Sequence, residues 1–177
     1  RQSAGLRQPV RGTHPDTSRL RIGYLTSDFV LHPTSFLTLQ VYGLHDRSRF
    51  EIFGYSLAVD DGSSNFRRIR EQCDHFVDLH GSTAEEIAAR IAADGIDILI
   101  DMNGYKLNGR SEVFALRPAP VLAGWVGYPS TLGLGLLDYL IVDGTVVPES
   151  AQHCYAEKIV RLPHCNLPTG LRGTGEW

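Results

Sequence analysis

Short apolar runs that alternate with helix-like segments constrain the fold of this chain more than any other feature. The run Ile96–Ile100 is nearly continuous in apolar residues, as is typical of a central parallel strand with both faces buried. Phe50–Leu57 alternates like a second strand, and Ser82–Glu86 contains the Ser/Thr-x-x-Glu spacing of a helix capping box. Strands that alternate with helices predict an α/β fold, here a Rossmann-like doubly wound parallel sheet.

The other expected elements continue this alternation. Further strands are expected at Ile22–Leu25, His75–Leu79, Pro120–Trp125, Tyr139–Val142 and Ile159–Leu162. Helices are expected at Thr34–His45, after a capping Asn65, from Ser82 to about Ala93, and at Ser111–Leu116. Residues 1–19 are interpreted as a flexible lead-in, and residues 166–177 as a truncated or non-native tail, because neither segment shows periodicity.

The composition bounds the size of the domain and the kind of partner. With 177 residues, 42% of them hydrophobic, the chain can form one large domain or half of a two-lobed protein. The formal net charge of -3 argues against nucleic acid as a partner. No apolar run is long enough to span a membrane, and the N-terminal segment lacks the apolar core of a signal peptide.

The cysteines indicate a reducing compartment. Cys73, Cys154 and Cys165 are odd in number and lack CxxC spacing, so free thiols and a cytoplasmic location are expected. Two cysteines directly follow a histidine, at His153 and His164. Adjacent residues on a strand point to opposite faces, so neither pair chelates easily and no metal site is predicted.

Three common classes of α/β enzyme find no support in the sequence. Gly133-Leu134-Gly135 lacks the third glycine of a dinucleotide-binding loop and does not follow the first strand. The chain contains neither a Walker-type GxxxxGK[ST] loop nor a GxSxG nucleophile elbow.

The stretch Arg21–Leu39 carries the first candidate site. Polar residues including Asp28 end an apolar strand, and His32 precedes Pro33 in the position of a helix N-cap. Ligands of open α/β sheets bind beyond the carboxyl ends of strands, where helix N-termini attract anions. Asp28 and His32 are therefore candidates for proton transfer or hydrogen bonding. The alternative, that Asp28 only closes a turn and His32 only caps a helix, stays equally open.

Two later loops also follow expected strands. Tyr105 of Asn103-Gly104-Tyr105 could offer a hydroxyl group to a cleft, and Gly127 could let a ligand approach the backbone, because glycine leaves room. The pattern alone favours plain turns at both places, the first with a half-buried tyrosine. Trp125 is interpreted as a core residue.

Six motifs in a fixed order carry a family resemblance. They are SDFxxHPTS, DDGSxNFR, DMNGY, FALRPAPVLAGWVGYPSTLG, LDYLIVD and YAEKIVRLPH. The chain resembles the O-linked N-acetylglucosamine (O-GlcNAc) transferase and SPINDLY family over roughly Leu20–His164. The resemblance implies that residues 20–165 are the N-terminal catalytic lobe of a two-lobed GT-B glycosyltransferase.

The resemblance also implies an activity. Such enzymes transfer N-acetylglucosamine from UDP-GlcNAc to Ser or Thr hydroxyls of proteins, with inversion of the anomeric centre and without a metal or cofactor. Two alternatives stay open: a SPINDLY-like protein O-fucosyltransferase using GDP-fucose, and a non-catalytic binding lobe. The donor base is read mainly by the second lobe, so these residues do not choose between donors.

The resemblance assigns roles to the first candidate site. His32 of HPTS matches the family's active-site histidine, which lies near the donor sugar and phosphates. Asp28 matches an aspartate proposed to take part in proton removal, and Thr34 matches the threonine of the same loop. Because Phe36 stands where some members have a second histidine, a role for that second histidine cannot apply.

The later loops match the family's sugar pocket. Tyr105 of MNGY, and Gly127 and Pro129 of GYP, match residues that line it, while Ser130 replaces a glycine found in many members. The second lobe, with its diphosphate-binding lysine, and the tetratricopeptide repeats do not occur among these residues. The expected partners are therefore a nucleotide-sugar donor, protein acceptors, the second lobe and possibly the repeats, and the lobe alone is expected to be inactive.

Overall fold

One parallel sheet forms the centre of the molecule. The computed structural model describes residues 19–168. Seven strands lie in the order β3-β2-β1-β4-β5-β6-β7, and every neighbouring pair is parallel. They are β1 (Leu20–Thr26), β2 (Phe50–Ser56), β3 (His75–Asp78), β4 (Ile98–Asp101), β5 (Val121–Trp125), β6 (Tyr139–Asp143) and β7 (Lys158–Leu162). The predicted α/β, Rossmann-like doubly wound sheet is confirmed.

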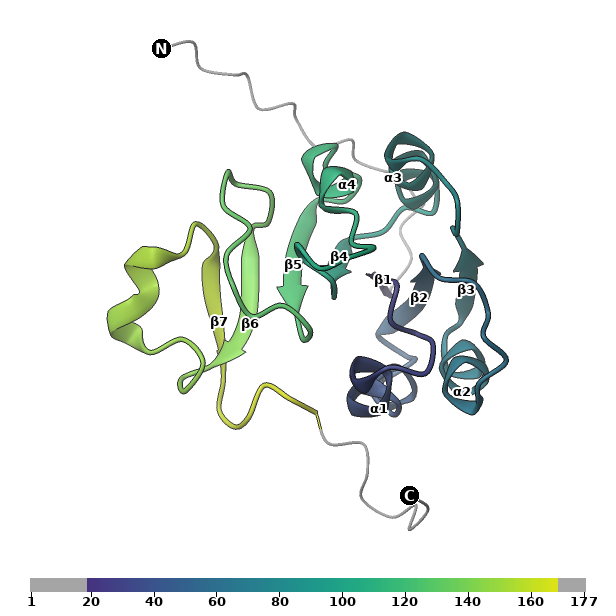
Figure 1. Ribbon diagram of the computed structural model, residues 1–177, viewed down its shortest axis with the longest axis horizontal. Helices are drawn as coiled ribbons and strands as arrows, with labels where there is room; N and C mark the ends of the chain where they lie inside the picture. The colour runs from purple at the N-terminus through teal and green to yellow at the C-terminus, as the bar shows by residue number, and fades with distance from the viewer. Residues whose placement is uncertain (1–18, 169–177) are drawn as a thin grey trace.

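Helices cover both faces of this sheet. The α-helices are α1 (Pro33–Thr38), α2 (Ser64–Gln72), α3 (Ala84–Ala93) and α4 (Ser111–Ala115), with 3-10 helices η1 (Tyr42–Leu44) and η2 (Glu149–Cys154). In Figure 1, α1 and α2 lie on one face of the sheet and α3 and α4 on the other. Successive β1 residues therefore enter different cores: Tyr24 packs with Tyr42 and Phe66, and Leu25 with the cluster that includes Ile87.

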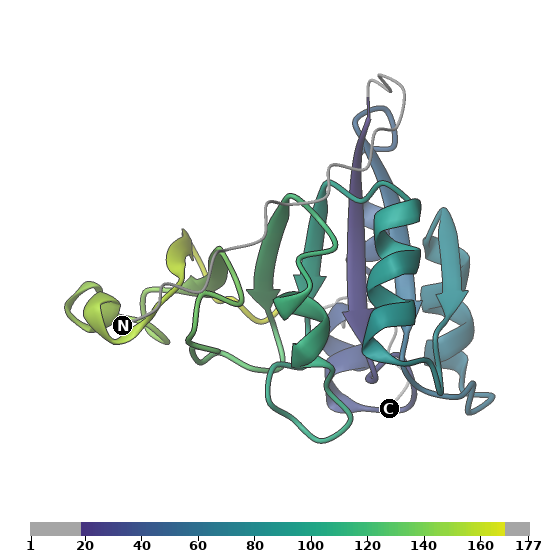
Figure 2. The same ribbon diagram turned by 90° about the horizontal axis from the view of Figure 1, so that it is seen from above.

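The strand order fixes where a ligand can bind. The chain moves outwards from β1 to β3 and then returns across the sheet to place β4 on the other side of β1. In Figure 2 the arrowheads of the purple, teal and green strands point to the same edge of the sheet. Because binding crevices of open α/β sheets lie where the strand order reverses, the loops after β1 and β4 are the expected place for a site.

The first helix is shorter than the sequence pattern predicts, so the expected extent Thr34–His45 is wrong. α1 ends at Thr38, whose hydroxyl donates to the carbonyl oxygen of Thr34 (2.9 Å). The backbone then tightens to bonds spanning three residues, from Val41 N–H to Thr38 O (2.9 Å) and from Leu44 N–H to Val41 O (3.2 Å). The segment therefore continues as a turn and the 3-10 helix η1.

The helix caps confirm one prediction and correct another. Thr83 and Glu86 form the expected capping box at the start of α3. α2 is capped by Ser63, whose hydroxyl accepts from the N–H of Phe66 (3.1 Å), rather than by Asn65. Asn65 lies inside the first turn and is buried, with its amide group donating to Ser35 Oγ (3.0 Å). The side chain thus joins α2 to α1.

The described region, residues 19–168, ends close to the predicted boundaries of the lobe, residues 20 and 165. Residues 1–18 of the expected lead-in and residues 169–177 of the expected tail lie outside the described residues. Asn166 is buried, and its N–H donates to Asp143 Oδ2 (2.8 Å). Between residues 19 and 168, no helix has the length and apolar character needed to cross a membrane.

The cysteines are free thiols, and burial raises the pKa of Cys73 to about 12.

Candidate functional site

Loops from β1 and β4 meet at the point where the strand order reverses. Asp28 and His32, both from the loop after β1, line a cavity of about 340 Å³ together with Lys106 from the loop after β4. The Asp28 side chain is 8% exposed, and its Oδ2 lies 3.5 Å from His32 Nδ1. The structure thus brings the two predicted residues of the first candidate site together beside one cavity.

Lys106 is a site residue that the sequence analysis missed. Its Nζ donates to Asp28 Oδ2, so the buried carboxylate has a cationic partner. The ion pair joins residues 78 positions apart, which only the adjacency of β1 and β4 makes possible. The one available signal was that this lysine, one of only two in the chain, directly follows Tyr105.

A chain of hydrogen bonds holds the other carboxylate oxygen. Ser27 Oγ donates to Asp28 Oδ1 (3.1 Å) and accepts from the Asn103 amide group (3.0 Å). The Asn103 side-chain oxygen in turn accepts from the N–H of Ser27 (2.8 Å). Because Ser27, Asp28 and Asn103 are all buried, this arrangement fixes the Asp28 carboxylate against the two strands.

Asp101 shapes the loop that carries Lys106. The carboxylate of Asp101, at the end of β4, accepts from the N–H groups of Asn103 (2.9 Å) and Gly104 (3.1 Å). Burial raises the pKa of Asp101, and these bonds and the nearby Lys106 only partly oppose the rise. Asp101 therefore stabilises the conformation of the loop next to the cavity.

Replacing Asp101 with alanine is expected to lower the free energy of unfolding by about 1–3 kcal/mol, because two buried N–H groups lose their acceptor. Asparagine keeps Oδ1, which serves both donors. Since the folded-state pKa of Asp101 is raised, its ionisation costs stability as the pH rises above the unfolded value near ~4. Denaturant melts across this range should therefore show the stability of Asp101→Asn improving relative to the parent as pH rises. A constant difference would contradict this.

His32 serves both as a cap and as a cavity residue. It is the N-cap of α1: its Nδ1 accepts from the N–H of Thr34 (3.2 Å), and its own N–H donates to Ser35 Oγ (3.3 Å). The imidazole is also 40% exposed and lines the cavity. The predicted cap is confirmed, and the same ring lines the cavity; Thr34 is buried in the first turn of α1, where its N–H orients the ring.

The predicted sugar-pocket residues lie in the neighbouring loops. Tyr105 is half exposed, and its hydroxyl donates to the carbonyl oxygen of Leu132 (2.6 Å), which braces the two loops. Gly127 adopts φ +103°, and a Cβ atom there would lie 2.4 Å from the Met102 carbonyl oxygen and 3.4 Å from Lys106 Nζ. Pro129 is exposed in the same loop. Gly127 thus lies beside Lys106, which lines the cavity, whereas Pro129 is not among the residues that line it.

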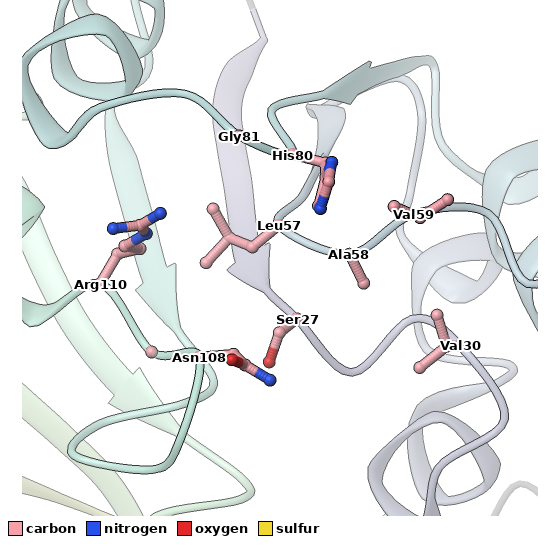
Figure 3. Close-up of a pocket in the computed structure, with 10 residues that line it drawn as sticks. Ser27, Val30, Leu57, Ala58, Val59, His80, Gly81, Asn108 and Arg110 are labelled. Atoms are coloured by element: carbon pink, nitrogen blue, oxygen red, sulfur yellow. The ribbon is translucent and has the colours of Figure 1, made fainter.

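A larger cavity extends from the first along the same edge of the sheet. Its volume is about 540 Å³, and it shares Ser27, Val30 and Asn108 with the smaller cavity. Figure 3 shows Arg110 and His80 on opposite sides of Leu57, with all lining residues drawn from loops that follow β1 to β4. None of the ten lining residues is acidic, so this cavity suits neutral or anionic groups.

Metal-binding groups do not form a cluster in the described part of the chain. Among residues 19–168, no three side chains of the His, Cys, Asp or Glu type are arranged to hold an ion. The two His-Cys pairs that the sequence raised belong to separate segments, and Cys154 Sγ lies 3.4 Å from its neighbour His153.

Comparison with known proteins identifies one matching family model and relatives that share one enzyme description. A family model described as Glycosyl transferase family 41 matches residues 7–168. The UDP-N-acetylglucosamine--peptide N-acetylglucosaminyltransferase of Caenorhabditis elegans is 48% identical over 151 residues, which cover 82% of this chain and 13% of that protein. The probable enzyme SEC of Arabidopsis thaliana, of the same description, is 44% identical over 83% of this chain and 15% of its own length. The probable enzyme SPINDLY of the same plant is 32% identical, with coverages of 84% and 16%.

A solved structure of similar fold agrees with these relatives. A mutant of Thermobaculum terrenum O-GlcNAc transferase superimposes with a TM-score of 0.81 at 34% identity, over 85% of this chain and 29% of that chain. The chain therefore spans less than a third of that protein and about a seventh of the curated relatives. The fold agrees with the expected lobe of a GT-B glycosyltransferase.

Proposed function

Because this chain belongs to glycosyl transferase family 41, we propose that it forms the N-terminal catalytic lobe of an inverting protein O-glycosyltransferase. The enzyme moves N-acetylglucosamine from UDP-GlcNAc to Ser or Thr hydroxyls of proteins. The observation that carries this proposal is the placement of Asp28 and His32 beside one cavity at the switch point of the sheet. All three relatives named above, SPINDLY included, are described as UDP-N-acetylglucosamine--peptide N-acetylglucosaminyltransferases, which supports this donor.

The proposed chemistry needs a charged leaving group to be stabilised. The acceptor oxygen forms a bond to the anomeric carbon as the bond from that carbon to the nucleoside diphosphate breaks on the opposite face, and the proton of the acceptor hydroxyl is released to solvent. The Nε2 side of His32 donates a hydrogen bond to the departing diphosphate, because Nδ1 is already used by Thr34. Asp28 has both oxygens engaged, by Ser27 and Lys106, so it fits orientation of the site better than removal of the proton.

The remaining partners follow from the size of the chain. It spans 13–16% of the curated relatives described above, so we propose that a second lobe completes the nucleotide site and that tetratricopeptide repeats select protein acceptors. The lobe alone is then inactive. The larger cavity, which continues from the smaller one and has no acidic lining residue, is proposed to take acceptor residues next to the reacting hydroxyl.

Nucleotide release by the complete catalytic region tests this proposal. UDP-GlcNAc and GDP-fucose are offered separately, each with a Ser/Thr-rich acceptor, and a His32→Asn variant serves as the control. We expect acceptor-dependent release from UDP-GlcNAc that falls in the variant. Release from GDP-fucose alone would move the chain to the fucosyltransferase alternative. Release from neither donor, with both lobes folded, would favour a non-catalytic binding lobe.

A further inference from the structure

The function proposed above uses Lys106 only as a partner of the buried Asp28 carboxylate at the centre of the site. We infer that Lys106 is a positioning residue that sets the tautomer of His32. By holding Asp28 Oδ2, it keeps Nδ1 of His32 available as the cap of α1 and leaves the ring proton on Nε2. The kinetic consequence of this inference rests on the proposed function, whereas the tautomer itself does not.

The hydrogen bond from Thr34 defines one side of the ring. Its backbone N–H donates to His32 Nδ1 at 3.2 Å, and a nitrogen that accepts a hydrogen bond carries no proton. In a neutral imidazole the proton then lies on Nε2. This arrangement also satisfies one of the free N–H groups in the first turn of α1.

Asp28 works against this arrangement. Its Oδ2 lies 3.5 Å from the same Nδ1, and a carboxylate at this distance favours a proton on the facing nitrogen. A proton on Nδ1 would point its N–H at Asp28 and deprive the Thr34 N–H of its acceptor. The hydrogen bond from Thr34 therefore requires Nδ1 to be unprotonated, whereas the charge of Asp28 favours a proton on it. The tautomer then depends on a third group that changes the charge near Nδ1.

The ammonium group of Lys106 is this third group. It donates to Asp28 Oδ2, the oxygen nearest His32 Nδ1, and so offsets the negative charge that this nitrogen faces. The Asp28 side chain is 8% exposed and that of Lys106 is 26% exposed, so water screens the pair only in part. Ser27 already binds Oδ1, which leaves Oδ2 as the oxygen that Lys106 controls.

The loop after β5 lies beside this lysine. The ammonium is 3.4 Å from the position that a Cβ atom would take at Gly127, which is an ordinary contact distance. Asp101 and Asn103 hold the start of the loop that delivers Lys106 to the site. The loops after β1, β4 and β5 therefore converge on one ion pair.

A double-mutant cycle in the complete catalytic protein tests whether Lys106 acts through Asp28. Lys106→Met is expected to lower kcat about tenfold with the KM for UDP-GlcNAc within about twofold of the parent, and Lys106→Arg to recover most of the loss. In an Asp28→Asn background, Lys106→Met should lower kcat by less than about twofold further, because the group it neutralises is gone. Lys158→Met, the loss of the chain's other lysine on β7, is the matched control and should leave kcat unchanged.

The tautomer is read directly by nitrogen-15 NMR of histidine-labelled protein, with His32 assigned from the spectrum of His32→Asn. At a pH where the His32 imidazole is neutral, the parent should show the ring proton on Nε2, and Lys106→Met should show proton density on Nδ1. Asp28→Asn together with Lys106→Met should restore the parent signature. This readout needs no substrate, so it separates failure of the inference from failure of the proposed function.

Two results would overturn the inference. The first is an unchanged His32 signature in Lys106→Met. The second is a full additional loss of kcat, or a raised KM for UDP-GlcNAc, when Lys106→Met is added to Asp28→Asn, because that outcome means that Lys106 contacts the donor itself. If the parent transfers no sugar but the signature shifts as expected, the positioning role stands and the proposed function fails.

Discussion

Replacing His32 with asparagine in the complete enzyme is expected to lower kcat at least about tenfold, which corresponds to about 1.4 kcal/mol of activation free energy. Asparagine is among the best N-cap residues, so its side-chain oxygen can still accept from the N–H of Thr34. What the variant loses is the exposed imidazole beside Asp28 and Lys106. Steady-state kinetics with UDP-GlcNAc and an acceptor protein measure the effect.

A comparison with His32→Ala separates the two roles of this residue. Alanine removes the imidazole and the cap together, so we expect the same loss of kcat and a further loss of stability of about 1 kcal/mol. Thermal melts of both variants measure the second quantity. Near-normal turnover by a folded His32→Asn protein would show that the histidine only caps α1.

Replacing Gly127 with alanine is expected to lower the free energy of unfolding by about 3 kcal/mol or more and to reduce activity with it. Two costs combine: the residue has φ +103°, which L side chains rarely adopt, and the added Cβ atom would lie 2.4 Å from the Met102 carbonyl oxygen. Relief of the clash requires the loop after β5 to move away from β4, which also disturbs Lys106. Urea denaturation measures the loss.

Gly133→Ala is the matched control for this prediction. Gly133 also has a positive φ, +64°, but a Cβ atom there meets nothing within 4 Å. Its replacement is therefore expected to cost only about 1–2 kcal/mol, the price of the left-handed backbone alone. Equal losses in the two variants would mean that the contact with Met102 contributes nothing and that backbone strain accounts for both.

The architecture follows from local patterns along the chain. The nearly continuous apolar run Ile96–Ile100 and the alternation of strands with helices predicted the doubly wound sheet, because a strand buried on both faces shows no polar alternation. The sequence also determined the capping box at Thr83 and the N-cap position of His32, since these features depend on residues within a single turn. The extent of α1 was not determined, because side-chain bonds such as that of Thr38 compete with the helix.

The assembly of the site depends on contacts between distant parts of the chain. Asp28, Lys106 and Gly127 come from three loops, and neither pattern nor spacing relates residues on strands that are distant in sequence. Lys106 belongs to no recognised motif. Asn65 is of a residue type that caps helices, but Ser63 caps α2 and the Asn65 side chain bonds to Ser35 instead. Local sequence specifies local hydrogen bonds, whereas the pairing of a buried charge depends on which strands become neighbours, and that is a property of the folded sheet.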